Sequence, residues 1–243
     1  MAMEKSDPLE LTTPSAQEPV LQVPPEERFA AQLRGFGPIG LLAIVVVVLG
    51  NVLIVPLSAV LVLLWAWKSH TPWREIGYSR PQSWWASAAL GAVLGIALKL
   101  LMKSVVMPLF GADPVNHAFH YLSHNQAAIP ATLYAMIIGA GFGEETFFRG
   151  YLFERLGKLF GKSRSAKFAI VLGTSIVFGL AHYSVQGLAG TEQAAIVGLV
   201  FASIFASTRR LWMLMCAHAA FDLTAYALIY WGWETKVAHW VFQ

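Results

Sequence analysis

The chain alternates between long apolar runs and short polar segments. Six apolar runs occur, at Pro38–Trp67, Trp84–Phe110, Ile129–Arg149, Lys167–His182, Glu192–Thr208 and Leu211–Trp231. A helix of about 20 apolar residues is long enough to cross the ~30 Å hydrocarbon core of a bilayer. The pattern therefore predicts an all-α fold, a polytopic transmembrane helical bundle with about six spans.

The first of these runs, Pro38–Trp67, is too long for one upright helix and too short for two. Thirty residues of helix measure about 45 Å, more than a ~30 Å core requires. Gly50, Asn51 and Pro56 interrupt the run. We expect one long helix, tilted or kinked; a re-entrant hairpin is the alternative.

Composition supports a membrane protein and divides the chain into four parts. Of the 243 residues, 56% are hydrophobic and 13% are charged, which is too apolar for a soluble domain. Residues 1–36 are rich in Pro, Glu, Gln, Ser and Thr, which predicts a disordered tail that becomes helical near Glu26–Leu33. We expect N-terminal membrane helices at 37–128, the core with the chemical motifs at 129–231 and a short tail at 232–243.

Lys and Arg residues gather in alternate polar segments. Lys68–Ser83 has three of them, Tyr151–Lys167 has five, and Arg209 and Arg210 follow, whereas Gly111–Ala127 has none. Cytoplasmic loops of membrane proteins carry an excess of Lys and Arg, so we expect the basic segments in the cytoplasm and the protein in an inner or plasma membrane. The basic residues flank the membrane and form no separate patch, so nothing indicates nucleic-acid binding.

Two adjacent carboxylates and an arginine end the third apolar run, in Gly139-Ala-Gly-Phe-Gly-Glu144-Glu145-Thr-Phe-Phe-Arg149. An ionised side chain in hydrocarbon costs about 2.5–3.5 kcal/mol, so each of the three needs a partner or a function. Glu145 and Arg149 are four apart with the Glu first, the order that favours an ion pair on a helix. Glu144 points about 100° away, so we expect it to be the free carboxylate. The small residues before it allow close helix approach and leave room for a substrate.

Further ionisable residues lie inside apolar runs. His182 ends the fourth run, and His218 and Asp222 are four apart in the sixth, on one helix face. If these residues are purely structural, His218 and Asp222 form a pair in which each side chain has its polar partner. His182 then caps the end of the fourth helix at the membrane interface. Together with Glu144, they are candidates for a functional site.

Two other clusters each allow a structural and a functional interpretation. Lys99 and Lys103 lie one turn apart in the second run, where they snorkel or line the bundle interior, or else hold an acidic group in a cavity. His117, His120 and His124 share one face of a polar segment, as solvated interfacial histidines or as a metal site. No carboxylate or cysteine joins these histidines, which disfavours the metal site.

The candidate chemistry is activation of water. Glu144 in an apolar pocket suits a general base, a histidine beside it can share the water or protonate a leaving amine, and a second histidine, oriented by an aspartate, can donate to an oxyanion. Alternatively, Glu144, His182 and His218 bind a divalent metal such as zinc and leave a fourth position for water. The HExxH pattern of many zinc proteases does not occur, and no cofactor is predicted beyond this alternative.

Three motifs in order resemble those of the CAAX protease and bacteriocin-processing family of intramembrane endopeptidases, also called Abi proteins, which includes the type II CAAX prenyl endopeptidases. They are Glu144-Glu145-Thr-Phe-Phe-Arg149, similar to EExxxR, Phe178-Gly-Leu-Ala-His182, similar to FxxxH, and His218-Ala-Ala-Phe-Asp222, similar to HxxxN or HxxxD. The segment Trp73-Arg-Glu-Ile-Gly-Tyr-Ser-Arg-Pro81 is similar to the loop before the family's core. The motif-bearing resemblance covers residues 129–230.

The resemblance implies a cavity among the motif helices that is open to the cytoplasm and the bilayer. By analogy, Glu144 and His182 activate water, and His218 and Asp222 form the oxyanion side. Family members are described both as metalloproteases and as metal-free glutamate proteases. Where the family has Asn, this chain has Asp222, which cannot donate a hydrogen bond when ionised and would orient His218 or touch a metal.

We therefore predict an intramembrane endopeptidase that hydrolyses a peptide bond near the cytoplasmic membrane face. Its partners would be a protein or peptide substrate, lipidated or not, and membrane lipid. A non-proteolytic scaffold or immunity factor of the same family is one alternative. A small proton-coupled transporter using Glu144, Lys99 and Lys103 is another, although the chain has no internal repeat.

Overall fold

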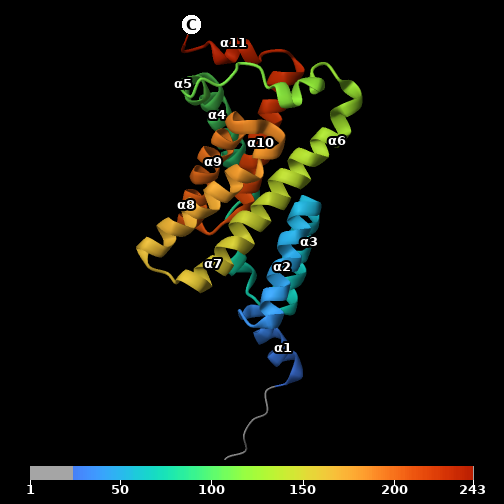
Figure 1. Cartoon of the computed structure of the whole chain (residues 1–243), viewed down its shortest axis with the longest axis vertical. Coiled ribbons are helices and arrows are strands. Elements are labelled where there is room, and N and C mark those ends of the chain that lie inside the picture. The colour runs from blue at the N-terminus through green and yellow to red at the C-terminus, as the bar shows by residue number, and fades with distance from the viewer. Residues whose placement is uncertain (1–23, 243) are drawn as a thin grey trace, which may run out of the picture.

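The computed structural model describes residues 24–242, and this part of the chain is helical and without strands (Figure 1). Its α-helices are α1 Pro25–Arg34, α2 Pro38–Leu53, α3 Val55–Lys68, α4 Trp84–Leu101, α5 Met107–Leu109, α6 Ile129–Tyr134, α7 Phe153–Phe160, α8 Arg164–Ala181, α9 Tyr183–Thr208, α10 Leu211–Tyr230 and α11 Glu234–Ala238. The 3₁₀ segments are η1 Trp73–Ile76, η3 His117–Leu122 and η4 Gln126–Ala128, and the π-helical segments are η2 Met102–Val106 and η5 Ala135–Leu152. The predicted all-α class is confirmed. The predicted tail lies outside the described residues except for its last part, which forms α1.

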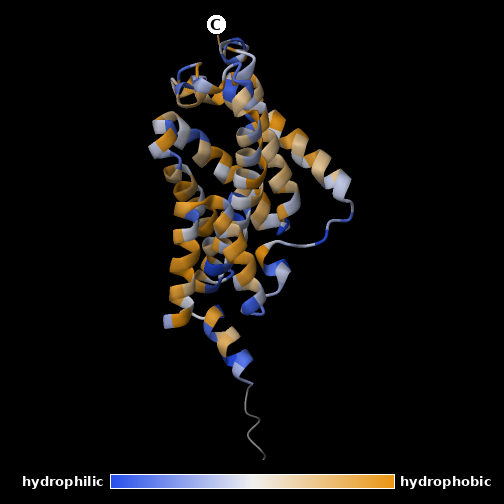
Figure 2. Ribbon diagram, turned by 90° about the vertical axis from the view of Figure 1, so that its right-hand side faces the viewer, coloured by the Kyte–Doolittle hydropathy of each residue, from blue (hydrophilic) through white to orange (hydrophobic). Residues whose placement is uncertain are grey.

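Five continuous helical stretches of the described chain are long and apolar enough to cross a membrane, and there are six if α1 and α2, bent by 59°, count as one span. They are Trp84–Leu109, Gln126–Phe160, Arg164–Ala181, Tyr183–Thr208 and Leu211–Tyr230. Figure 2 shows hydrophobic residues along these helices and hydrophilic ones concentrated towards the ends of the molecule. The chain is an integral membrane protein.

The first apolar run folds back on itself as a hairpin of α2 and α3, so the prediction of one long helix is wrong. Ile54 between them is extended, with φ −151° and ψ 111°. Pro56 lies in the first turn of α3, where its missing N–H is not needed. The two helices pack against each other, and the Trp65 indole near the end of α3 donates to the Leu33 carbonyl of α1, just before α2, at 3.1 Å. With 16 and 14 residues, each helix is about 21–24 Å long, shorter than the ~30 Å core.

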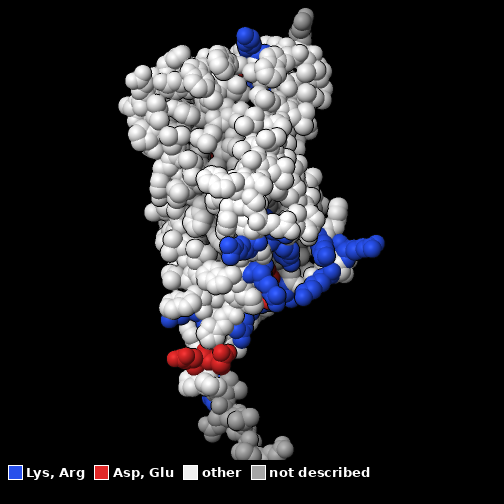
Figure 3. All heavy atoms as spheres, turned by 180° about the vertical axis from the view of Figure 1, so that it is seen from behind, with Lys and Arg blue, Asp and Glu red and all other residues white. Residues whose placement is uncertain are grey.

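The hairpin brings α1 to the same end of the molecule as the basic loops. Arg155 of α7 donates to the carbonyl of Arg34 at 2.9 Å, and Arg34 donates to the carbonyl of Ser69. We call this the basic end (residues 25–34, 68–83, 155–167 and 209–210); Figure 3 shows Lys and Arg gathered towards it. The opposite, distal end (residues 110–128 and 231–242) has Lys236 as its only Lys or Arg.

The helices approach each other closely where glycines face a neighbour. A Cβ atom at Gly95 of α4 would collide with the Ala217 carbonyl of α10, and one at Gly179 of α8 would lie 2.9 Å from the Thr191 carbonyl of α9. Such small residues let helices in lipid pack backbone to backbone. Helices from both sides of residue 128 thereby share one core.

A long helix made of α6, η5 and α7 crosses the molecule obliquely from the distal to the basic end (Figure 1). It ends at Phe160, and the capping Gly161 has a φ of 85°, which favours glycine. We call it the motif helix. α9 begins at Tyr183, before the fifth apolar run of the sequence starts at Glu192. Gly187, with φ 63°, kinks the helix near its start.

Candidate active site

The four candidate catalytic residues come from three elements that meet at one cavity of about 490 Å³. Glu144 comes from η5, His182 from the end of α8, and His218 and Asp222 from α10. The motif helix runs on past Glu144 to Phe160, so the site lies near the middle of its length. Extended π-helical geometry such as that of η5 is rare, and short π-helical insertions are frequent at functional sites.

Glu145 and Arg149 form the ion pair that their spacing predicts, and both are buried. Arg149 Nη1 lies 2.9 Å from Glu145 Oε1, and the guanidinium lies 4.5 Å from the centre of the Phe178 ring. The same carboxylate oxygen accepts a hydrogen bond from His218 Nδ1 at 2.7 Å. Arg149 Nη2 also donates to the Gly198 carbonyl at 3.4 Å, so the pair links three helices.

His218 is held with its Nε2 towards the cavity. Because the Glu145 carboxylate paired with Arg149 only accepts, Nδ1 of the histidine carries the proton of this bond. Nε2 lies 3.7 Å from Glu144 Oε2 and 3.9 Å from Asp222 Oδ2. From the sequence, we expect Asp222 to orient His218. Glu145 takes that place, because Asp222 lies one turn further along α10 and faces the cavity side of the ring.

Glu144 is the carboxylate that makes no hydrogen bond through its buried oxygen, Oε2, in the described part of the chain. A Cβ atom at Gly139 would meet nothing within 4 Å, whereas Gly141 and Gly143 lie against α10 and α3. The small residues before Glu144 therefore leave space on one side and allow close packing on the other.

His182 lies at the C-terminal end of α8, where one ring nitrogen is held by a hydrogen bond and the other can act as a base. Its Nδ1 lies 2.8 Å from the Phe178 carbonyl oxygen. A carbonyl only accepts, so Nδ1 carries the proton and Nε2 of the neutral ring is left as a base. Glu144 is near enough to interact electrostatically with both His182 and His218.

Sequence reasoning missed polar neighbours that other elements contribute. The buried Lys99 ammonium donates to Gln193 Oε1 at 3.0 Å, and both residues line the cavity. Lys99 thus lines the bundle interior, but nothing in the spacing of α9 singles out Gln193. The Tyr78 hydroxyl lies 2.7 Å from Thr146 Oγ1, which ties the segment after η1 to the motif helix.

The other polar candidates lie at the distal end, away from Glu144. Lys103 pairs with Glu234 of α11 at 3.5 Å, and the exposed His117 pairs with Asp113 at 3.1 Å. His124 occupies a left-handed turn with φ 53°. The first contact joins η2 to α11, and the second lies within the distal loop (residues 110–128).

The side chains of this structure do not fit a metal ion. Across residues 24–242, no three His, Cys, Asp or Glu side chains form a group that could hold one. This applies to Glu144, His182 and His218 and equally to the three histidines of the distal loop. We therefore derive no step through a metal.

Residues 126–224 match the family model described as type II CAAX prenyl endopeptidase Rce1-like. This segment, 99 of the 243 residues, is therefore similar to the Rce1-like family. The match contains Glu144, His182, His218 and Asp222, and it confirms the predicted resemblance. Comparisons with curated proteins and with solved structures find no match. This similarity supports a CAAX-protease-like function within the membrane, with a peptide as substrate.

Proposed function

We propose that the chain is an intramembrane endopeptidase in which Glu144 activates a water molecule. The proposal rests on the buried Glu144 Oε2, which accepts no hydrogen bond within residues 24–242. This oxygen lies 3.7 Å from His218 Nε2, in a cavity large enough for a substrate. A general base must lie within hydrogen-bond reach of the proton that it removes. One water placed beside Glu144 and His218 meets this condition.

Each residue of the site has its own role in the hydrolysis. Glu144 takes a proton from water while the water oxygen bonds to the carbonyl carbon of the scissile peptide. His218, protonated on Nε2 and held by Glu145, donates to the resulting oxyanion, and Asp222 stabilises its charge. The C–N bond then breaks, and the leaving amine receives the proton from Glu144 directly or through His182.

The cavity suits a substrate with an apolar stretch. Besides the polar site residues, its wall consists largely of small and apolar side chains, among them Ala128, Ala131, Ala135, Met136 and Ala140. Apolar side chains or a lipid modification of the peptide would be buried favourably there. We place the protein in an inner or plasma membrane with its basic end in the cytoplasm, because Lys and Arg gather at that end.

Comparison of membranes that contain the wild type or Glu144→Gln tests the proposal. Glutamine keeps the shape of the side chain but cannot take a proton, so cleavage should fall by about 10²–10⁴-fold. Mass spectrometry of peptide termini should show products in the wild type that are missing in the variant. Asp113→Asn, at the exposed surface of the distal loop, is the matched control and should keep the products.

Two results would favour the alternatives. If the termini are the same with Glu144→Gln, proteolysis fails and a non-proteolytic scaffold or immunity role becomes the better proposal. Ion flux through proteoliposomes that depends on Glu144 and Lys99 would instead support a transporter.

A further inference from the structure

The basic end contains a cavity of its own, of about 590 Å³, which we call the basic cleft. Its walls come from η1, α7, the loop between α7 and α8, the start of α8 and the end of α9. None of the four candidate catalytic residues lines it. Five cations do, namely Arg74, Lys158, Lys162, Lys167 and Arg209.

The two carboxylates of the basic cleft are already paired. Glu154 is buried and holds Arg155 at 2.9 Å and the Lys158 ammonium at 2.7 Å. Glu75 lies 3.7 Å from the same ammonium. Within residues 24–242, no carboxylate pairs with the other four cations of the cleft, Arg74, Lys162, Lys167 and Arg209. The cleft therefore carries an excess of positive charge, which an anion from outside the chain would neutralise.

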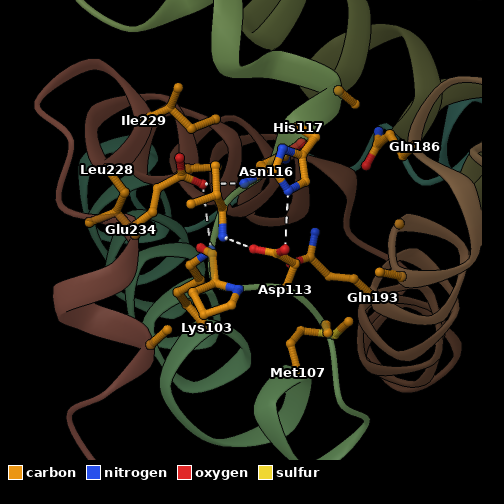
Figure 4. Close-up of a pocket in the computed structure, with 18 of the residues that line it drawn as sticks. Lys103, Met107, Asp113, Asn116, His117, Gln186, Gln193, Leu228, Ile229 and Glu234 are labelled. Carbon is orange, nitrogen blue, oxygen red and sulfur yellow. Dashed lines mark hydrogen bonds and ion pairs between the residues drawn. The ribbon is translucent and has the colours of Figure 1, made fainter.

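The polar cavity at the distal end, of about 200 Å³, gives a comparison (Figure 4). There, Lys103 pairs with Glu234 at 3.5 Å and His117 pairs with Asp113 at 3.1 Å. This cavity is lined by two Lys residues and by two carboxylates. Its charges are thus balanced by the chain itself, whereas those of the basic cleft are not.

Arg209 has a strained backbone at the edge of the basic cleft. Its φ of 54° and ψ of 36° are left-handed, and it caps the end of α9, where glycine is the usual residue in this conformation. A residue with a Cβ atom is disfavoured there. Strain of this kind is frequent at ligand-binding positions. In return, the cleft has a guanidinium, the side chain best suited to binding two oxygens of a phosphate.

Gly157 keeps space in the basic cleft. It lies inside α7, where glycine is less favourable than alanine. No close neighbour requires a glycine there, because a Cβ atom would meet nothing within 4 Å. Since Gly157 lines the cleft, the missing side chain leaves room for a ligand beside the buried apolar wall of Phe153 and Ile170.

The cleft lies at the ends of helices that are long enough to span the membrane, and therefore at the level of lipid headgroups. Lys162 lies between the candidate spans Gln126–Phe160 and Arg164–Ala181, and Arg209 directly follows Tyr183–Thr208. Large apolar side chains next to the cleft cations in the chain are 57%, 60% and 68% exposed, at Leu159, Phe160 and Phe168. Cations beside exposed apolar side chains are typical of segments that lie among headgroups and the first part of the acyl chains. A soluble anion would use the charges alone, whereas a phospholipid would use both kinds of side chain.

We infer that the basic cleft binds the headgroup of an anionic phospholipid. The phosphate oxygens accept hydrogen bonds from Lys162, Lys167 and Arg209, and the acyl chains lie along the exposed apolar side chains of α7 and α8. Basic pockets between membrane helices hold such headgroups in other membrane proteins. The bound lipid would join α7, α8 and the end of α9. The inference does not depend on the proposed function, because the cleft contains none of the residues of the candidate active site.

Native mass spectrometry of the full chain in detergent tests the inference. The protein is titrated with phosphatidylglycerol, which is anionic, and with phosphatidylcholine, which has no net charge. The wild type should bind phosphatidylglycerol at least about tenfold more tightly than phosphatidylcholine. The double variant Lys162→Gln, Arg209→Gln should bind phosphatidylglycerol about tenfold or more weakly than the wild type, because each cation near an anionic lipid adds to the attraction.

Two further variants separate the cleft from the general charge of the basic end. Arg80→Gln with Arg210→Gln removes two exposed cations that do not line the cleft, and it should keep the affinity for phosphatidylglycerol within about twofold. Gly157→Leu fills the cleft without changing the charge and should lower this affinity about tenfold. Leucine favours a helix more than glycine does, so α7 should be retained, which circular dichroism checks.

Three outcomes would overturn the inference. One is equal affinity of the wild type for the two lipids. Another is an equal loss of affinity in the Arg80, Arg210 control and in the cleft variants, because the lipid would then respond to charge in general. The third is binding of inorganic phosphate that is lost with Lys162→Gln and Arg209→Gln, without any preference for phosphatidylglycerol; the cleft would then be a site for a soluble anion.

Discussion

Between the candidate site and the basic end, buried charges are paired and surrounded by rings. Arg155 is bound by Glu154 at 2.9 Å and lies 4.6 Å from the centre of the Trp65 ring, and Arg149 is held by Glu145 in the same way. Glu144 lies beside these pairs and faces the cavity. Its buried Oε2 accepts no hydrogen bond within residues 24–242, and open space lies beside it. Paired charges in packed surroundings hold the helices together, whereas the unpaired carboxylate is free to react. Two adjacent glutamates thus belong to two different regions.

The largest expected difference between the regions concerns these two glutamates. Glu145→Gln removes the charge opposite Arg149 and weakens the bond to His218, so it should lower the free energy of unfolding by about 3–5 kcal/mol. Glu144→Gln should change it by less than about 0.5 kcal/mol, because no bond is lost. Denaturation of the purified proteins in the same detergent measures both. Equal losses in the two variants would show that the regions do not differ in this way.

The next difference concerns two glycines with the same backbone conformation. Gly77 at the basic end has φ 85° and Gly111 at the distal end has φ 73°. Alanine at either position should cost about 1–2 kcal/mol for the left-handed backbone. At Gly77, its Cβ would also lie 2.5 Å from the Phe205 ring and 2.7 Å from Leu211, which adds about 1–3 kcal/mol, while Gly111 has nothing within 4 Å. Denaturation of Gly77→Ala and Gly111→Ala should therefore differ; a smaller loss for Gly77→Ala would contradict close packing of the basic end.

The smallest effect concerns a single hydroxyl. Tyr78→Phe removes the hydrogen bond to Thr146 and should lower the free energy of unfolding by about 0.5–1.5 kcal/mol at pH 7. Tyr121→Phe, at an exposed residue of the distal loop, is the control and should be neutral within about 0.5 kcal/mol.

The pH dependence sharpens the test on Tyr78. Burial raises the pKa of Tyr78 from 10.0 to about 12, although the hydrogen bond to Thr146 acts in the opposite direction. The folded protein therefore holds the phenol proton more tightly than the unfolded chain, and this contribution, complete below pH 10, is lost as the pH rises through 12. The wild type should lose stability relative to Tyr78→Phe over this range, by up to about 3 kcal/mol. Parallel curves for the two proteins would mean that the hydroxyl is not buried.

The all-α class, the later membrane helices and the pair of Glu145 with Arg149 could be predicted from the sequence. Each depends on residues close together in the chain. An apolar run of membrane length must satisfy its own backbone hydrogen bonds and therefore becomes a helix, and an i, i+4 pair is formed within that helix. The three motifs also predict four site residues, and the structure brings these four to one cavity.

Only the tertiary structure decided the hairpin of α2 and α3, the role of Glu145 behind His218 and which residues line the cavity. The hairpin depends on packing of α2 against α3, and Glu145 meets His218 across 73 positions of sequence. Apolar residues that pack in the core and apolar residues that line the cavity look alike in a hydropathy pattern. Which of them pack together and which leave space is set by the angles at which helices cross, and helix periodicity does not specify those angles.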